Sequence, residues 1–228
     1  MTTGLTMPSV NLYGLARSVY TRIARLAVEE KGVTHTLHEV EIFGPSGVPE
    51  AHRSRHPFGR IPALEHDGFW LYETGAITRY VDEAFAGPSL QPSDPRSRAR
   101  MNQIISVLDS YGYRPMVWHV FVERVGQPLR GRAADETKIV AGLSASAQCL
   151  DALAALAPWR PFVLGADLTL ADLHAYPMLC ALALAPDGQA LLNRYDDLRR
   201  WLQAMQRRSS VQGTRTPYET QLPTSTQA

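Results

Sequence analysis

Residues 56–74 read HPFGRIPALEHDGFWLYET and contain most of the information about the fold. The pair Asp67-Gly68 separates two short apolar runs, which is a strong signal for an antiparallel hairpin. A break precedes the hairpin at Pro57 and Gly59. After it, Glu73-Thr74 opens a helix with an apolar face made of Ile77, Tyr80, Val81 and Phe85. This stretch therefore predicts a loop, a hairpin and a helix.

Toward the N-terminus, the apolar run from Val10 to Tyr13 predicts a strand that ends at Gly14. Helical spacing follows from Ser18 to Lys31, and Gly32 is placed to end that helix. A second extended segment is expected over residues 36–42, followed by a loop over residues 44–49. The first 85 or so residues thus form an α/β unit with both parallel and antiparallel pairing.

Residues 87–95 contain three prolines and are expected to be a linker. The chain beyond them shows helical periodicity, and Pro115 is expected to kink the first long helix. Thr169 and Asp172 have the spacing of a capping box. The polar tail from Ser209 is expected to lack fixed structure. The predicted parts are residues 1–86, 87–95, 96–208 and 209–228. Three helices of this half are each expected to carry a stripe of apolar residues. The stripes consist of residues 101, 104, 105, 108 and 111; residues 139, 140, 143, 150 and 153; and residues 198, 201, 202 and 205.

Composition excludes several classes of function. The 228 residues carry 23 basic and 22 acidic side chains, so no net field would attract nucleic acid. Cys149 and Cys180 are far apart, which argues against a disulfide scaffold and a thiolate metal site. His52 and His56 have helical metal-ligand spacing, but Pro57 ends any helix there, so no metal site is expected. No signal peptide or bilayer-spanning run is apparent, and a cytoplasmic protein is predicted.

The order of elements resembles the cytosolic glutathione transferases over residues 8 to 205. Four motifs carry the resemblance: Leu12-Tyr13-Gly14 with Ser18 and Glu29-Glu30-Lys31-Gly32; residues 56–64, similar to the family's Asn-Pro-x-Gly-(Lys/Gln)-Val-Pro-x-Leu; Glu73-Thr74, similar to its Glu-Ser pair; and Gly165 with Thr169-x-x-Asp172. The active-site turn resembles that of bacterial, Ser-type members. His56 and Arg60 depart from the common Asn and Lys or Gln. The implied fold class is α+β with two domains, a thioredoxin-like α/β domain followed by an all-α domain.

The resemblance implies an enzyme of detoxification that conjugates the thiolate of glutathione to hydrophobic electrophiles. Glutathione would be a co-substrate with no further cofactor, and the protein would be a homodimer that binds neither nucleic acid nor membrane. Two alternatives stay open, since one fold supports many functions. The first is a glutathione-dependent isomerase or peroxidase, although isomerases of this fold usually show a Ser-Ser-Cys-like turn where this chain reads ARSVY, residues 16–20. The second is a glutathione-binding or scaffold protein without turnover.

Five residues are candidates for binding glutathione. Thr74, at a helix start, offers its amide and hydroxyl to the γ-glutamyl carboxylate, and Glu73 could pair with the α-ammonium group. The alternative is that Thr74 caps its helix and Glu73 complements the dipole. In the family the bond before the residue equivalent to Pro62 is cis, so Ile61 would offer its backbone to the cysteinyl unit. Arg60 could reach a glutathione carboxylate or simply face solvent.

Thiolate activation needs a hydrogen-bond donor, because a free thiol with a pKa of about 8.5 is mostly protonated at neutral pH. Ser18 is the first candidate, since it starts the first helix where Ser-type transferases carry their hydroxyl; it could equally be a plain cap. Tyr13 and Tyr20 are the rivals. No cysteine occurs from Gly14 to Thr21, which argues against the Cys-type classes.

In the family the electrophile lies in an apolar cleft. Large side chains on the first long helix of the second half are the candidates to line it: Tyr111, Tyr113 and Trp118, with His119 beside them. The alternative is that these residues are helix-packing or dimer contacts.

Overall fold

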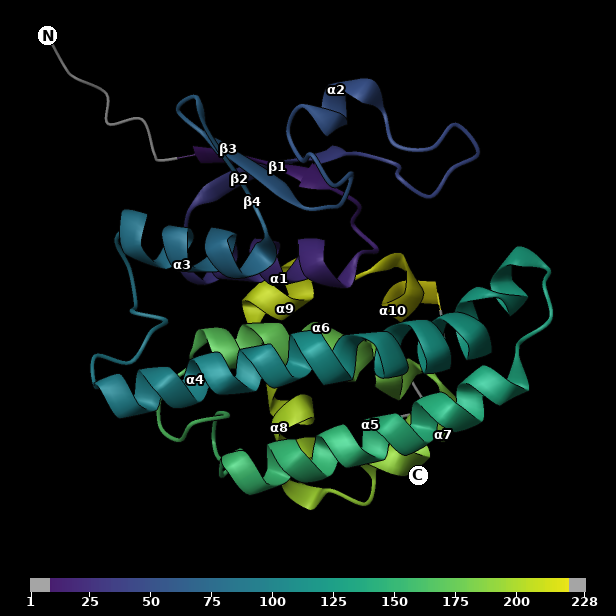
Figure 1. The fold of residues 1–228 in the computed structure, drawn as a ribbon. Helices are drawn as coiled ribbons and strands as arrows, with labels where there is room; N and C mark the ends of the chain where they lie inside the picture. The colour runs from purple at the N-terminus through teal and green to yellow at the C-terminus, as the bar shows by residue number, and fades with distance from the viewer. Residues whose placement is uncertain (1–8, 222–228) are drawn as a thin grey trace, which may run out of the picture. The chain divides into compact units, whose positions relative to one another are not determined.

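The computed structural model describes residues 9–221. They divide into two compact units, one with residues 9–89 and 213–217 and the other with residues 90–212 and 218–221. The first unit contains a sheet and three helices, and the second is helical (Figure 1).

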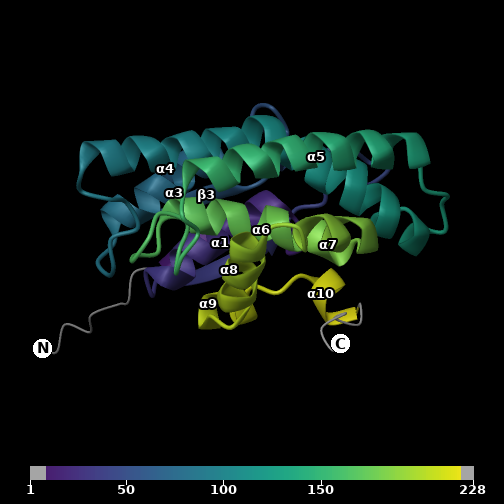
Figure 2. The ribbon, with the colours of Figure 1, turned by 90° about the horizontal axis from the view of Figure 1, so that it is seen from below.

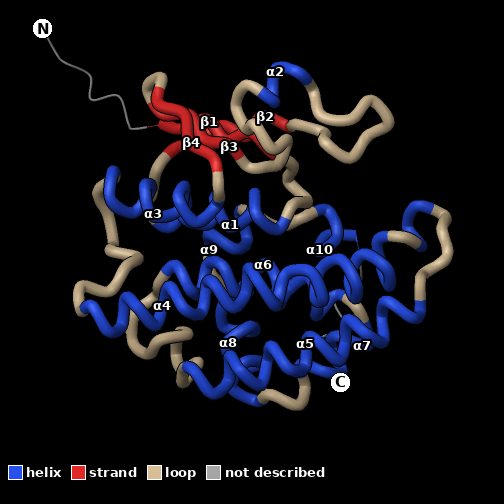
Figure 3. The backbone as a smooth tube through the Cα atoms, in the orientation of Figure 1, coloured by secondary structure: helices blue, strands red, loops and turns tan. Residues whose placement is uncertain are grey.

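The sheet of the first unit has four strands: β1 (Ser9–Gly14), β2 (Thr34–Glu39), β3 (Ala63–His66) and β4 (Phe69–Tyr72). Their order is β2-β1-β3-β4, with β1 and β2 parallel and the other pairs antiparallel. Helices α1 (Val19–Glu30) and α3 (Thr74–Ala84) pack together on one face, and the short α2 (Glu50–Arg53) lies on the other side (Figures 1 and 3). The predicted thioredoxin-like α/β domain is confirmed.

Local signals explain where these elements begin and end. Asp67 and Gly68 both have positive φ, at 50° and 81°, which is the backbone of the tightest hairpin turns. Helix α1 begins after Ser18 and ends at Lys31, and Gly32 follows with φ of 65°, a conformation that glycine adopts without strain. The predicted hairpin and first helix are therefore confirmed.

The second unit begins with α4 (Pro95–Val107), which continues as the π-helical segments η1 (Leu108–Gly112) and η2 (Arg114–Gly126) and a short 3₁₀ turn η3 (Pro128–Arg130). Then follow α5 (Glu136–Leu156), α6 (Leu170–Leu184), α7 (Pro186–Leu192) and α8 (Asp196–Gln206), seen from below in Figure 2. Helix α6 is buried along most of its length between α4, η2, α7 and α8. The all-α prediction for this half is confirmed.

Two expected core positions are wrong. Tyr111 is 68% exposed, because the helix changes to π winding at Leu108 and the turn widens beyond 3.6 residues. The stripe that starts at Met101 therefore continues through Leu108 to Gly112 instead of Tyr111. Val140 is 67% exposed, because it lies about 100° around α5 from its buried neighbour Ile139.

Helix α5 is, within residues 9–221, the single helix long and apolar enough to cross a membrane. Core helices of water-soluble proteins have the same length and composition, so this property is weak evidence for a membrane span. In this structure α5 packs against η1, η2, α4 and α7.

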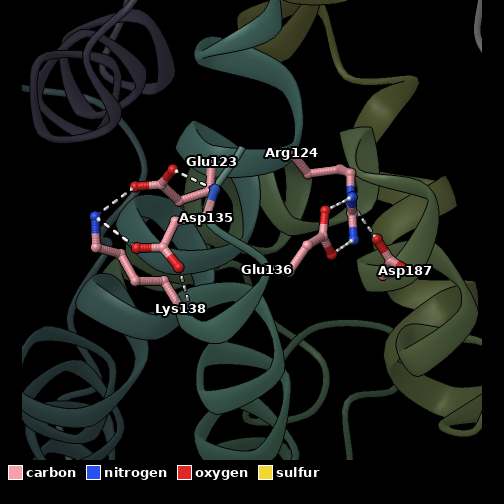
Figure 4. A network of polar contacts seen from close by, with 6 residues as sticks. All are labelled: Glu123, Arg124, Asp135, Glu136, Lys138 and Asp187. Carbon is pink, nitrogen blue, oxygen red and sulfur yellow. Dashed lines mark hydrogen bonds and ion pairs between the residues drawn. The ribbon is translucent and has the colours of Figure 1, made fainter. Parts of the chain in front are cut away.

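A network of charged side chains fixes the connection between η2, α5 and α7. It contains Glu123, Arg124, Asp135, Glu136, Lys138 and Asp187 (Figure 4). The Arg124 guanidinium donates to both oxygens of Glu136, at 2.7 and 2.9 Å, and to Asp187 at 2.6 Å. The buried Glu123 carboxylate accepts from Lys138 at 3.0 Å and from the Asp135 backbone N–H at 3.2 Å. These bonds hold both ends of the loop between η2 and α5.

The tail from Ser209 was expected to lack fixed structure, and this is wrong for its described part. Residues 209–221 form two short helices, α9 (Ser209–Gly213) and α10 (Pro217–Gln221). In the first unit Arg25 donates to the Gly213 carbonyl at 3.1 Å and Thr214 is buried. In the second unit the Tyr218 ring packs edge-on against Phe121. Contacts with distant residues thus order a segment whose composition is polar; residues 222–228 lie outside the described residues.

Candidate active site

The strand register gathers three candidate segments at one end of the sheet. Tyr13 pairs with Ala63, and Ala63 pairs with Tyr72. The turn to Ser18 follows Tyr13, the Ile61-Pro62 segment precedes Ala63, and Glu73-Thr74 follows Tyr72. Because the β1–β3 and β3–β4 pairs are antiparallel, all three segments leave the sheet at the same end.

Packing holds two of these segments together. Ile61 is buried with Leu15 and Val40 in one apolar cluster, and Tyr13 packs against it. Leu15 also accepts a hydrogen bond from the Ser18 backbone N–H at 2.9 Å. The turn that carries Ser18 and the segment that carries Ile61 are therefore neighbours. The Ile61–Pro62 bond is cis, as the resemblance implies.

Ser18 is half-buried and caps helix α1. Its hydroxyl oxygen accepts from the Thr21 backbone N–H at 3.3 Å, so the capping alternative is correct. Capping uses the oxygen as an acceptor, and a hydroxyl can donate its hydrogen at the same time. The cap therefore does not compete with hydrogen-bond donation to a ligand sulfur.

The Tyr13 ring is held by three other side chains on the sheet face away from α1 and α3. It stacks on His38 with 4.7 Å between ring centroids, lies 5.2 Å from the Trp70 ring, and has the Arg55 guanidinium 4.3 Å from its centroid. Tyr20 lies half-buried in the first turn of α1.

Glu73 and Thr74 form the start of α3. Glu73 has φ of 71°, a backbone conformation that is uncommon for a non-glycine residue and that costs free energy. Thr74 is the first helical residue and is buried, while the N-cap position belongs to Glu73 and has no side-chain capping bond. The alternative in which Thr74 merely caps its own helix is therefore wrong. The first amides of α3 lie at the positive end of the helix dipole.

The charges of Glu73, His52 and Arg60 act on the side chain of His56. His56 is buried with its ring 4.8 Å from the Tyr72 ring, and Arg60 is exposed. Burial lowers the pKa of His56, the nearby Glu73 carboxylate opposes this, and His52 and Arg60 lower it further. Within residues 9–221, no group of three or more histidine, cysteine or acidic side chains is placed to hold a metal ion.

The electrophile candidates all lie in the second unit, on the π-helical stretch. Tyr111 and Trp118 are exposed, whereas Tyr113 and His119 are half-buried. Pro115 falls within this stretch, where the backbone is π-helical rather than α-helical. An aromatic side chain exposed on a helix can contact an apolar ligand or another protein chain.

Comparisons with known proteins identify the family. Residues 12–89 match the glutathione S-transferase N-terminal domain family. Glutathione S-transferase PM239X14 of Arabidopsis thaliana is 34% identical over 179 residues, which cover 75% of this chain and 80% of that protein. The chain belongs to the glutathione S-transferase family.

Solved structures of glutathione S-transferases agree with this assignment. Glutathione transferase F7 from Populus trichocarpa superposes with a TM-score of 0.79 at 26% identity, over 90% of this chain and 97% of that one. A further sequence relative, glutathione S-transferase F14 of Arabidopsis thaliana, is 30% identical over 154 residues. These residues cover 66% of this chain and 60% of that protein. The comparisons do not support the expected resemblance to bacterial members, since these relatives are plant transferases.

Two residues next to this candidate transferase site, His52 and Arg55, were not predicted from the sequence. His52 was considered as a metal ligand and set aside, yet its Nε2 lies 2.7 Å from the Arg60 carbonyl oxygen. Its spacing of eight residues from Arg60 crosses a break in helical structure, so no periodicity connects the two. The stack of Arg55 on Tyr13 was also missed, because Tyr13 lies in β1 and Arg55 follows α2, and no local pattern connects these two segments.

Gly14 is required where β1 meets the first turn of α1. A Cβ atom on Gly14 would lie 2.4 Å from Thr21 Oγ1 and 2.9 Å from its Cγ2. Replacing Gly14 with alanine should destabilise the protein by about 1–3 kcal/mol, because the added Cβ atom would overlap the Thr21 side chain. Urea denaturation measures this change. The double variant Gly14→Ala, Thr21→Ala should recover most of the loss, since both close atoms are gone; no recovery would contradict the steric explanation.

His56 should make the stability of this transferase depend on pH. Burial lowers its pKa in the folded state below the ordinary value of about 6.5, so the unfolded chain takes up a proton that the folded chain does not. The free energy of unfolding should therefore fall as the pH decreases from 7 to 5. The variant His56→Asn should show a flatter dependence in urea denaturation at several pH values. Burial lowers the pKa of His35 too, so some slope should remain; a slope equal to that of wild type would refute the role of His56.

Proposed function

We propose that this chain conjugates the thiolate of glutathione to hydrophobic electrophiles. The observation that carries the proposal is the register Tyr13–Ala63–Tyr72, which directs the segments bearing Ser18, Ile61 and Thr74 to one end of the sheet. A tripeptide thiol needs a carboxylate site, a backbone partner and a donor to sulfur, and these three segments offer one each.

The glutamyl end of glutathione would bind at the start of α3. The Thr74 amide and hydroxyl would donate to the α-carboxylate, supported by the positive end of the helix dipole. Glu73 would accept from the α-ammonium group, and its unusual backbone would direct it toward this ligand. The exposed Arg60 could donate to a glutathione carboxylate.

The cysteinyl unit would pair with the backbone of Ile61. The strand ladders on both sides of β3 begin at Ala63, so Ile61 and Pro62 lie beyond the hydrogen bonding of the sheet. An extended peptide placed there can form backbone hydrogen bonds like an added strand.

Ser18 would keep the sulfur ionised, which makes this a Ser-type site. The Thr21 N–H donates to the Ser18 oxygen, and the Ser18 hydrogen would be donated to the thiolate. Such a bond, together with the start of α1, favours the anion over the thiol. Tyr13 is the weaker candidate because it lies in strand β1, whereas Ser18 lies at the start of α1, where the helix dipole also favours an anion. The thiol proton is released to solvent when the bound thiol ionises, so no general base is needed. The sulfur then forms a bond to the electrophilic carbon, and the leaving group departs with its electron pair.

The electrophile would contact the aromatic side chains of the π-helical stretch, Tyr111, Tyr113 and Trp118. The relatives include maize glutathione S-transferase I, whose structure is in complex with an atrazine glutathione conjugate. We further propose a cytoplasmic homodimer that binds neither nucleic acid nor membrane and needs no metal.

The test is to measure binding and turnover separately. Calorimetry should detect glutathione binding, and chlorodinitrobenzene should be converted to its glutathione conjugate faster than without protein. Binding without conjugation of any aryl halide or enone would favour a scaffold protein. Oxidation of glutathione by a hydroperoxide, with no conjugation, would favour a peroxidase. Absence of binding would refute the proposal.

A further inference from the structure

We infer that His52 is a positioning residue for glutathione: its ring holds the Arg60 carbonyl and thereby directs the Ile61 N–H toward the cysteinyl unit of the ligand. The inference rests on the proposed function. It adds a residue from α2, which contributes none of the groups proposed above to contact glutathione.

The hydrogen bond defines which atom of the ring is protonated. His52 is 1% exposed, and its Nε2 lies 2.7 Å from the Arg60 carbonyl oxygen. Because a carbonyl oxygen only accepts, Nε2 must carry a hydrogen. The Nδ1 atom is buried and has no hydrogen-bond partner within residues 9–221. The bond to Arg60 is therefore the single polar contact found to orient this ring in the described structure.

Peptide geometry transmits this contact to Ile61. The Arg60 carbonyl and the Ile61 N–H belong to one peptide unit, which is trans, whereas the following Ile61–Pro62 bond is cis. In a trans unit the C=O and N–H point in opposite directions. Holding the Arg60 oxygen on the His52 side thus fixes the direction of the Ile61 N–H on the other side.

His52 also closes the loop that leads from α2 to β3. Its backbone carbonyl accepts from the N–H groups of Arg55, at 3.0 Å, and His56, at 2.9 Å. The His56 carbonyl accepts from Gly59 at 2.8 Å. The ring of His52 spans this loop and connects its start to its end. The peptide before Ile61 is therefore fixed before any ligand arrives, which reduces the entropy cost of binding.

Two variants separate this role from general support of the fold. His52→Phe keeps a ring of similar size and removes the donor, whereas His52→Gln retains an N–H donor near the position of Nε2. We expect His52→Phe to weaken glutathione binding in calorimetry, and to raise the KM for glutathione, by about 3- to 10-fold, the effect of one hydrogen bond. The kcat at saturating glutathione and the pKa of the bound thiol should not change, because Ser18 is untouched. His52→Gln should bind glutathione within about 2-fold of wild type.

The outcomes distinguish this inference from the proposed function. If wild type does not bind glutathione, the proposed function is refuted and the inference with it. If wild type binds and His52→Phe binds equally well, the inference alone is overturned. If His52→Phe lowers kcat and also raises the KM for chlorodinitrobenzene, then His52 supports the fold in general. This result would also overturn the inference.

A measurement on the wild-type protein makes the test independent of whether His52→Phe folds. Nitrogen-15 NMR of the His52 ring should show the hydrogen on Nε2, and the Ile61 amide resonance should shift when glutathione is added. A hydrogen on Nδ1 alone, or an Ile61 amide that does not respond to bound glutathione, would overturn the inference.

Discussion

Replacing Ser18 with alanine should raise the pKa of the thiol of bound glutathione by about two units. At a pH below the thiol pKa of both proteins, the variant should conjugate roughly 100-fold more slowly than wild type. The hydroxyl that would donate to the sulfur is lost, and the ionised fraction falls about tenfold for each pKa unit. Ultraviolet titration of the bound thiolate measures the pKa, and the initial rate with chlorodinitrobenzene measures the consequence.

The cap role of Ser18 makes a matched control necessary. Alanine at this N-cap should also cost about 0.5–2 kcal/mol of stability, whereas glycine should cost only a few tenths. Ser18→Gly should therefore show the full change in thiol pKa with little loss of stability. Ser18→Thr keeps both the hydroxyl and the cap and should retain most activity.

Tyrosine variants test the rival donors. Tyr13→Phe and Tyr20→Phe should leave the pKa of the bound thiol close to that of wild type. If either phenylalanine variant raises it while Ser18→Ala does not, the donor is that phenol and the proposed Ser-type site is wrong.

Replacing Asp172 with alanine should destabilise the protein by about 3–5 kcal/mol, because the change leaves buried donors without an acceptor. Asp172 is fully buried at the start of α6. One of its oxygens accepts from the Val163 N–H and from Trp201 Nε1, both at 2.8 Å, and the other accepts from the Thr169 N–H at 2.9 Å and its hydroxyl at 3.1 Å. Burial raises the pKa of this carboxyl, and the four hydrogen bonds oppose that rise. Urea denaturation at pH 7 measures the loss.

Two smaller changes show whether the carboxylate acts as the centre of this network. Thr169→Ala removes the cap hydroxyl and should cost about 1 kcal/mol. Trp201→Phe removes one donor and keeps an aromatic ring against Trp159. Each should cost clearly less than Asp172→Ala; equal losses would mean that packing around α6, rather than the carboxylate, carries the stability.

Features that depend on a few neighbouring residues could be predicted from the sequence, whereas contacts between distant residues could not. The hairpin at Asp67-Gly68 and the cap at Ser18 were predicted because each depends on a few neighbouring residues. The cap at Thr169 was predicted on the same grounds, although the reach of Asp172 to Trp201, 29 residues away, was not visible. The exposure of Tyr111 was missed because π winding leaves no periodic signal that differs clearly from α-helix over five residues.

The sequence by itself determined the element order, the positions of turns and caps, and the family motifs, since these follow from local backbone preferences and side-chain chemistry. Only the tertiary structure decided which segments meet. Ser18, Ile61 and Thr74 are far apart along the chain and come to one sheet end through strand register, and the bond from His52 to Arg60 exists because both lie in one folded loop. Register and buried hydrogen bonds are fixed by packing between distant segments, so no local pattern of residues encodes them.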